Sequence, residues 1–179
     1  FAAMSSAIAL IPQDPEIFTA TIKENITMGV SHTMQTIRTF SDRARFTSVA
    51  EQLPKKFHSS IVEKGVNLSG GEKQRLALAR GLMVTGDKQM LLLDEPTSSV
   101  DAATELLIFE NIFQNYRGKT VIASVHRLHL LPMFDTIFLF ADGKIIASGS
   151  FATLKKNNPI FQKLWRQYHS VHKNNQQRT

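Results

Sequence analysis

The chain has 179 residues, of which 42% are hydrophobic, so it is long enough to bury one substantial core. It contains no cysteine, which excludes a disulfide framework and a thiolate metal site, and no apolar run reaches the ~18 residues that a membrane-spanning helix needs. The net charge of +6 arises at the end of the chain, because Lys155 to Thr179 holds six basic and no acidic residues. We interpret this segment as a solvated terminal helix, which is a commoner arrangement than a nucleic-acid or lipid contact.

The first third of the chain is predicted to begin with a strand and to continue with helices. The apolar run Ala7 to Ile11 is typical of a buried strand, and the prolines of Pro12-Gln13-Asp14-Pro15 favour an extended loop after it. A short helix is expected from Thr21 to Ile26, and a longer one from Ser31 to Leu53, which Pro54 ends.

The middle of the chain alternates helices and strands. A helix is predicted from Gly70 to about Met83, an apolar strand from Gln89 to Leu93, a helix from Ala102 to Tyr116 and a buried strand from Thr120 to Val125. Because such alternation is typical of parallel βαβ units, we expect an α/β protein with a mostly parallel sheet flanked by helices.

The last part of the chain is predicted to contain a hairpin and a helix. Thr136 to Phe140 and Lys144 to Ala147 are joined by Ala141-Asp142-Gly143, and an Asp-Gly turn favours an antiparallel pair. The C-terminal helix is expected to be interrupted near Pro159.

The segment Ser69-Gly70-Gly71-Glu72 opens a predicted helix, and its residues suit two roles. Ser69 and Glu72 have the spacing of a capping box. Glycine at interior helix positions costs roughly 1 kcal/mol relative to alanine, but it lets backbone N–H groups approach a phosphate at the positive end of the helix dipole. We expect this segment to do both.

A second segment, Met90 to Glu95, places the carboxylates of Asp94 and Glu95 at the C-terminal end of a buried strand. This edge of an open α/β sheet is where ligands bind. The pair is followed by Pro96-Thr97-Ser98, and the whole run comes soon after the glycine-containing segment, a combination that is rare by chance.

Together, Val66 to Arg75 and Met90 to Asp101 resemble the signature and Walker B motifs of the ATP-binding domain of ABC transporters. The resemblance spans residues 5–168. It implies the P-loop NTPase-like fold of ABC ATPases with a helical signature subdomain, and binding of ATP with Mg²⁺. In that family the signature loop contacts the γ-phosphate of an ATP held by a partner domain. The residues that this contact implies for nucleotide binding are Ser69, Gly70, Gly71 and Glu72.

Other site residues also follow from the resemblance. A Walker B strand implies that Asp94 organises Mg²⁺ and that Glu95 acts as general base on the attacking water. Gln13 resembles the Q-loop glutamine, which senses Mg²⁺ and water, and Asp101 resembles the D-loop aspartate, which reaches across the dimer. His126 resembles the switch histidine that contacts the γ-phosphate and the general base. The remaining histidines lack such support and are expected to be structural: His32, His58, His129, His169 and His172.

The phosphate-binding motif G-x-x-x-x-G-K-[ST] is not found in the chain. Gly118-Lys119-Thr120 imitates its end, but a helix precedes it and a strand follows it, which is the reverse of the required order, so a turn is predicted there. We interpret the sequence as the C-terminal part of a nucleotide-binding domain without the N-terminal strands and the Walker A region. We expect it not to hydrolyse ATP by itself.

The predicted division of the chain follows the motifs. Residues 1–29 would form the Q-loop strand and loop, 30–83 the helical subdomain with the signature, 84–154 the ATPase core with Walker B, D-loop and H-loop, and 155–179 a basic helix and tail.

Two further segments, Pro15 to Ile26 and Val62 to Gly65, resemble the exporter forms of the Q-loop and of the coupling loop. The exporter branch implies a domain at the cytoplasmic face of a membrane, fused behind a transmembrane domain and paired with a second nucleotide-binding domain, as a homodimer or a heterodimer. Hydrolysis would then drive transport, and no nucleic-acid partner is expected. The sequence does not indicate the cargo.

Two alternatives remain open. One is an ABC ATPase that acts on ribosomes or DNA, against which the exporter-like Q-loop argues. The other is a module that hydrolyses nothing and donates its signature motif to a partner. A P-loop encoded immediately upstream would exclude the second.

Overall fold

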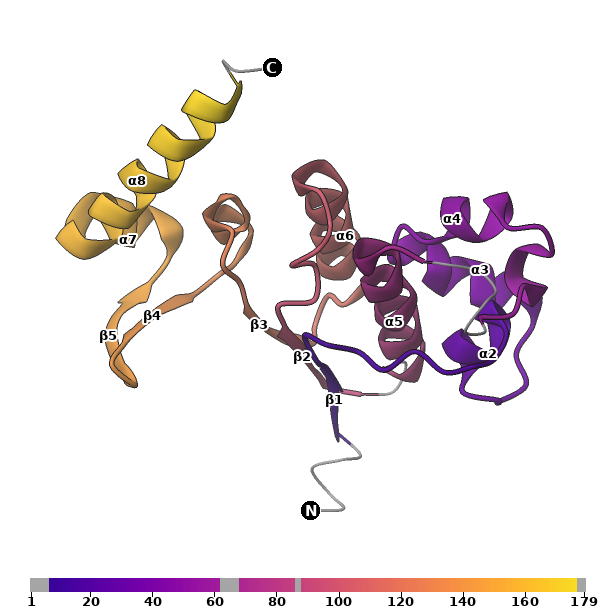
Figure 1. Ribbon diagram of the computed structural model, residues 1–179. Helices are drawn as coiled ribbons and strands as arrows, with labels where there is room; N and C mark the ends of the chain where they lie inside the picture. The colour runs from indigo at the N-terminus through magenta and orange to yellow at the C-terminus, as the bar shows by residue number, and fades with distance from the viewer. Residues whose placement is uncertain (1–6, 62–67, 86–87, 177–179) are drawn as a thin grey trace. The chain divides into compact units, whose positions relative to one another are not determined.

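The computed structural model describes residues 7–61, 68–85 and 88–176, and for 171–176 it describes the backbone alone. The chain divides into two units, residues 1–124 and 125–179, whose elements are labelled in Figure 1. None of the helices in the described ranges is both long enough and apolar enough to cross a bilayer.

A parallel sheet organises the first unit. Its strands are β1 (Ile8–Ile11), β2 (Met90–Asp94) and β3 (Thr120–Ser124), in the spatial order β1-β2-β3. Ile8 pairs with Met90 and Met90 with Thr120, so all three strands end at the same edge. The predicted strands and their parallel direction are confirmed, and their ends differ from the prediction by a residue or so, which is the usual uncertainty of such boundaries.

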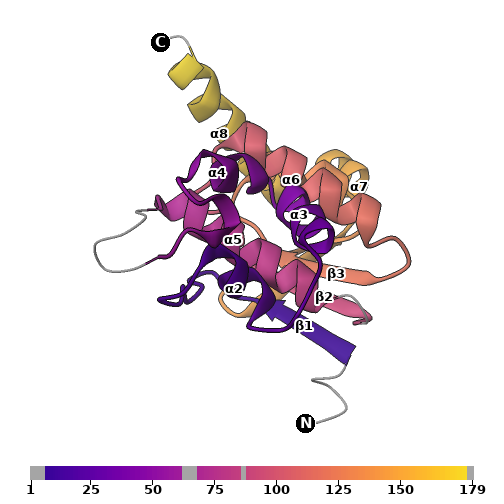
Figure 2. The ribbon, with the colours of Figure 1, turned by 90° about the vertical axis from the view of Figure 1, so that its right-hand side faces the viewer.

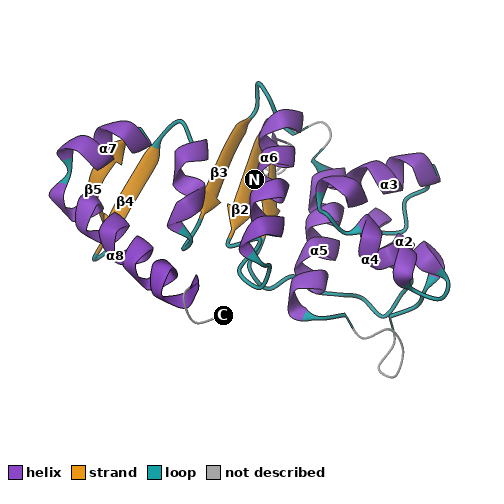
Figure 3. Ribbon diagram, turned by 90° about the horizontal axis from the view of Figure 1, so that it is seen from above, coloured by secondary structure: helices purple, strands orange, loops and turns teal. Residues whose placement is uncertain are grey.

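Several helices of the first unit gather on one side of this sheet, as Figures 1 and 3 both show. They are α2 (Ile22–Thr27), α3 (Met34–Arg43), α4 (Thr47–Gln52) and α5 (Gly70–Val84), with a 3₁₀ helix at Lys56–His58. Figure 2 shows α2 and α3 close to α5, and α5 packs against both helices and against β1. The buried apolar residues of α5 include Leu76, Leu78 and Leu82, none of which is exposed.

The prediction of one helix from Ser31 to Leu53 is wrong. The backbone breaks between α3 and α4, where Arg45 adopts a left-handed conformation with φ of 56°. Ala44 and Phe46 on either side are fully buried, and the carbonyl of Arg45 accepts a hydrogen bond of 2.7 Å from Arg75 Nη1 on α5. The burial of Ala44 and Phe46 and the hydrogen bond from α5 stabilise this bend, which the local sequence does not predict.

Helix α6 (Ala102–Asn115) connects β2 to β3, and it is tied to α5 near their C-terminal ends. The hydroxyl of Tyr116 donates to the carbonyl of Leu82 over 2.9 Å and is hydrogen-bonded to the Thr85 hydroxyl over 2.6 Å. Burial raises the pKa of Tyr116, although the bond with Thr85 opposes that rise. Gly118-Lys119-Thr120 follows as the predicted turn before β3, with Gly118 at φ of 80°.

The second unit contains the predicted hairpin and the interrupted C-terminal helix. A 3₁₀ helix (Leu128–Met133) is followed by β4 (Ile137–Ala141), β5 (Lys144–Gly149), α7 (Phe151–Asn157) and α8 (Pro159–Gln176). The two strands are antiparallel, and Asp142 and Gly143 both have positive φ in the turn between them. The unit has its own apolar core, which consists of Leu131, Ile137, Leu154 and Phe161.

Candidate functional site

Two predicted site residues meet just beyond the carboxyl ends of β1 and β2. Gln13 lies two residues after β1 ends, and Glu95 directly follows β2. The side-chain amide of Gln13 donates a hydrogen bond of 3.2 Å to Glu95 Oε2. The sheet thus brings an amide and a carboxylate from distant parts of the sequence together at the edge where α/β proteins bind ligands.

Glu95 has an unusual backbone for a residue with a side chain. Its φ is 43°, in the left-handed region that costs a non-glycine residue roughly 1–2 kcal/mol. Backbone bonds hold it there, since its N–H donates to the Ser124 carbonyl over 3.3 Å and its own carbonyl accepts from the Ser98 N–H over 3.2 Å. Such strained residues cluster at functional sites, where the surrounding structure fixes them.

Asp94 is the last residue of β2, and its side chain is exposed. Its Oδ1 accepts a 2.7 Å hydrogen bond from the hydroxyl of Ser124, the residue that pairs with it on β3. One carboxylate oxygen is therefore held by the neighbouring strand. Asp94 keeps the exposed position that binding of a ligand or metal ion requires.

The signature segment forms the N-terminus of α5. Ser69 is the N-cap, its hydroxyl accepts from the Glu72 N–H over 3.3 Å, and Glu72 accepts from the Ser69 N–H over 2.7 Å. The predicted capping box is confirmed. Ser69 and Gly70 are exposed, as a contact with a ligand requires. The predicted phosphate contact of these residues stays a prediction.

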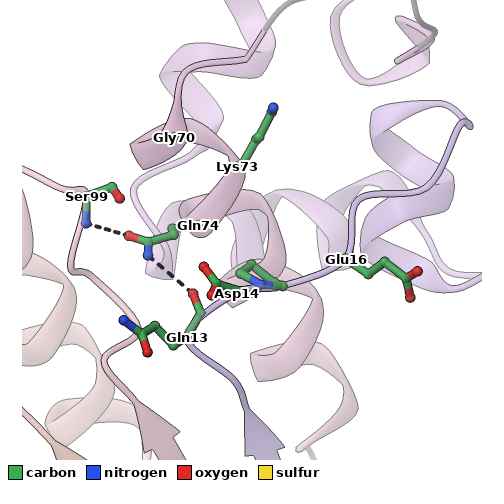
Figure 4. A pocket seen from close by; sticks show the side chains of 8 residues that line it. Gln13, Asp14, Glu16, Gly70, Lys73, Gln74 and Ser99 are labelled. Carbon is green, nitrogen blue, oxygen red and sulfur yellow. Dashed lines mark hydrogen bonds between the residues drawn. The ribbon is translucent and has the colours of Figure 1, made fainter.

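A cleft of about 420 Å³ lies between the loop after β1 and the start of α5, as Figure 4 shows. It contains two of the predicted site residues, Gln13 and Gly70, which come from different motifs. The full lining is Gln13, Asp14, Pro15, Glu16, Gly70, Lys73, Gln74 and Ser99.

The far end of the loop after β1 is anchored to α2 and α5. The buried side chain of Asn25 accepts from the Phe18 N–H and donates to the Phe18 carbonyl, both over 2.9 Å. Arg80 of α5 donates to the Asn25 carbonyl over 2.9 Å, and its guanidinium lies 4.7 Å from the centre of the Phe18 ring. Burial lowers the pKa of Arg80. These contacts hold the loop against the helices beyond Gln13.

Asp101 is the N-cap of α6. Its Oδ1 accepts a 2.9 Å hydrogen bond from the Thr104 N–H, and this bond is the main cause that lowers the pKa of the Asp101 carboxyl. The loop before it is fixed by a buried pair, in which the Thr97 hydroxyl donates to Glu105 over 2.6 Å. A structural role for Asp101 is thus established, and its predicted role across a dimer stays a prediction.

His126 lies in the second unit, two residues after β3 ends, and its side chain is exposed. Its predicted contact with Glu95 stays a prediction. His129, expected to be structural, is hydrogen-bonded to the Tyr168 hydroxyl over 2.8 Å. The predicted coupling loop Val62 to Gly65 lies outside the described residues, as do Val66 and Asn67 at the start of the signature segment.

The carboxylates at this edge of the sheet could hold a metal ion only if a bound ligand supplied further coordinating atoms. Among the described residues, no group of three or more histidine and acidic side chains could hold a metal. Mg²⁺ in phosphate-transfer sites is usually bound by one or two carboxylates together with substrate phosphates and water. Asp94 and the amide oxygen of Gln13 fit that limited share of a coordination sphere.

The sequence prediction missed Gln74, which is only 7% exposed. It contacts the loop of Gln13 as well as Ser98 and Ser99. One signal was available, because Gln74 precedes Leu78 and Leu82 by one and two turns. It is therefore a polar residue on the buried side of a predicted helix.

Comparison with known proteins identifies the family. The ABC transporter family model matches residues 2–98, which is more than half of the chain. The chain therefore belongs to the ABC transporter family, and its α/β fold with a parallel sheet and helices is that of an exporter's nucleotide-binding part.

Individual relatives agree with this assignment. The heterocyst differentiation ATP-binding protein HepA of a Nostoc species is 35% identical over 94% of the chain and 27% of its own length. The mitochondrial iron-sulfur clusters transporter atm1 of Aspergillus fumigatus is 34% identical over 90% of the chain and 22% of its own length. The solved structure of a bacterial Atm1-family ABC exporter with ATP bound superposes with a TM-score of 0.82 and 29% identity. This structural match covers 93% of the chain and 29% of that exporter. The chain thus spans about a quarter of these proteins.

Proposed function

We propose that this chain is the C-terminal part of the ATP-binding domain of an ABC exporter, and that the whole protein couples ATP hydrolysis to transport across a membrane. The observation that carries this proposal is the hydrogen bond of Gln13 to Glu95 at the ligand-binding edge of the sheet, with Asp94 beside it. The named relatives support it, since they are an ATP-binding protein, a transporter and an ABC exporter with ATP bound.

The residues divide the chemistry among them. Glu95 accepts a proton from the attacking water, and Gln13 orients that carboxylate through the bond to its Oε2. Asp94, held by Ser124, contributes a carboxylate to a magnesium ion. When bound, ATP and Mg²⁺ supply the phosphoryl group that passes to water and the positive charge that offsets the charge of the phosphates.

The remaining predicted residues belong to an assembly of two such domains. Ser69, Gly70, Gly71 and Glu72 present the N-terminus of α5 to the γ-phosphate of a nucleotide held by a second nucleotide-binding domain. Asp101 and His126 complete the site from the D-loop and the H-loop. The domain is joined to a transmembrane domain at the cytoplasmic face of the membrane, with no nucleic-acid partner.

The experiment that tests this function replaces Glu95 in the full-length protein that contains the chain. Glu95→Gln keeps the size of the side chain but removes the base, so turnover of Mg-ATP falls by about 100-fold or more, while ATP binding is retained. Glu110→Gln, at an exposed position of α6, is the matched control and keeps normal turnover. Turnover by Glu95→Gln at the control's rate would contradict the role of Glu95.

A further inference from the structure

Gln74 is a buried amide on the side of α5 that carries Leu78 and Leu82. Burial of an amide without hydrogen-bond partners costs roughly 1–3 kcal/mol in proteins, so a buried glutamine is stable only where its polar atoms are satisfied. At Gln74 the partners come from two loops outside the helix, and both loops touch the candidate site.

Three hydrogen bonds fix the side chain of Gln74. Its Oε1 accepts from the Ser99 N–H over 2.8 Å, and its Nε2 contacts the Ser98 hydroxyl at 2.7 Å and the Gln13 carbonyl at 3.4 Å. Figure 4 shows the amide between Ser99 and Gln13. Because a backbone N–H can only donate, Oε1 must face Ser99. The NH₂ group is then left to donate to the Ser98 hydroxyl in the same loop and to the Gln13 carbonyl in the other loop.

Both loops that Gln74 binds also hold Glu95. The Gln13 side chain donates to Glu95 Oε2, and the Ser98 N–H donates to the Glu95 carbonyl. Of these two bonds to Glu95, only the one from Gln13 reaches the carboxylate, so the position of the Gln13 loop relative to the Ser98 loop decides whether that bond forms. Catalytic geometry is sensitive to this kind of support, since a misplacement of about 1 Å can cost about 100-fold in rate.

We propose that Gln74 is a positioning residue, which holds the loops of Gln13 and Ser98 at a fixed separation and so keeps the Gln13 amide on Glu95. This inference rests on the proposed function of Glu95. It assigns Gln74 no contact with the nucleotide or the attacking water. Its role differs from a purely packing role because the effect on turnover passes through the Gln13 side chain.

The test uses the full-length protein with Gln74→Met, which keeps the length of the side chain and removes all three hydrogen bonds. The kcat for Mg-ATP falls by about tenfold or more, while KM changes by less than about threefold, because orientation and not binding is lost. Gln114→Met makes the same chemical change at an exposed position of α6 and is the matched control, with unchanged kcat.

A double-mutant cycle separates positioning from packing. Once Gln13→Ala has removed the amide that Gln74 positions, adding Gln74→Met lowers kcat by less than about twofold. Gln74→Glu is the conservative variant. It can still accept from the Ser99 N–H, but it sets a carboxylate oxygen against the Gln13 carbonyl, so it does not restore kcat.

Three kinetic results would each overturn the inference: a normal kcat for Gln74→Met, full additivity with Gln13→Ala, or rescue by Gln74→Glu. Hydrogen exchange of the full-length variant provides a readout that does not depend on turnover. In Gln74→Met the Ser99 amide and residues 13–18 exchange faster, and unchanged exchange there would also overturn it. Failure of the proposed function looks different, because the wild-type protein would then lack turnover or Glu95→Gln would retain it.

Discussion

Gly70 and Gly71 are neighbours in the signature segment, but the fold constrains them differently. A Cβ on Gly71 would lie 2.6 Å from the carbonyl oxygen of Ser99, so the close contact of helix and loop requires glycine there. A Cβ on Gly70 would lie 3.5 Å from Ser99 Cβ, an ordinary contact. The fold alone does not require glycine at position 70, and this supports the proposal that a ligand approaches there.

The two alanine variants are therefore expected to behave differently. Gly70→Ala leaves the melting temperature of the chain unchanged or higher, because alanine favours the helix by up to about 1 kcal/mol, but in the full-length protein it lowers ATP turnover by about tenfold or more. Gly71→Ala lowers the melting temperature itself. Full turnover by Gly70→Ala would show that no phosphate approaches this N–H group.

At the scale of the element, the caps of the helices explain why so many helix starts were predictable. Ser69 caps α5, Thr21 caps α2 and Asp101 caps α6, each with a side-chain oxygen that accepts a backbone N–H. These residue types favour the N-cap because they satisfy donors that the first turn leaves unpaired. For Asp101 the cap also carries a charge, and its pKa is lowered in the folded chain.

Asp101→Ala is expected to lower the free energy of unfolding by about 1 kcal/mol, and Asp101→Asn to spare it, because asparagine caps equally well. The charge adds a pH dependence. Since the folded pKa lies below the unfolded value, the stabilisation by the carboxylate is present above about pH 4 and fades as the pH falls through the folded pKa. Urea unfolding at several pH values checks this. Equal acid sensitivity of the wild-type chain and of the Asp101→Ala variant would contradict it.

Not every element boundary could be predicted, because some depend on tertiary contacts. The segment from Ser31 to Leu53 has a mixed apolar pattern and contains no glycine or proline. The backbone nevertheless turns at Arg45, because Arg75 binds the Arg45 carbonyl and Phe46 is buried. The same limit applies to Gln74, which the sequence prediction missed because its partners lie in two other loops. Residues in recognisable motifs, such as Gln13 and Glu95, were named from the sequence, and their hydrogen bond follows from the parallel sheet.

At the scale of the whole molecule, the described site is rich in carboxylates at the edge of the sheet. Asp94 and Glu95 lie there together with Gln13. The phosphate-binding motif of this family is not found among the 179 residues. Carboxylates alone repel a triphosphate, so binding needs positive charge and N–H donors that these residues do not offer. The relatives are about four times as long as the part that this chain matches.

Calorimetric titration of Mg-ATP into the chain and into the full-length protein tests this expectation. The chain alone binds with a Kd weaker than about 1 mM, which corresponds to about −4 kcal/mol, and the full-length protein binds at least about tenfold tighter. Glu95→Gln in the full-length protein is the matched comparison, since it retains binding without turnover. Tight binding by the chain alone would reveal a phosphate site within these residues, and the signature, base and magnesium roles proposed for them would then have to be assigned again.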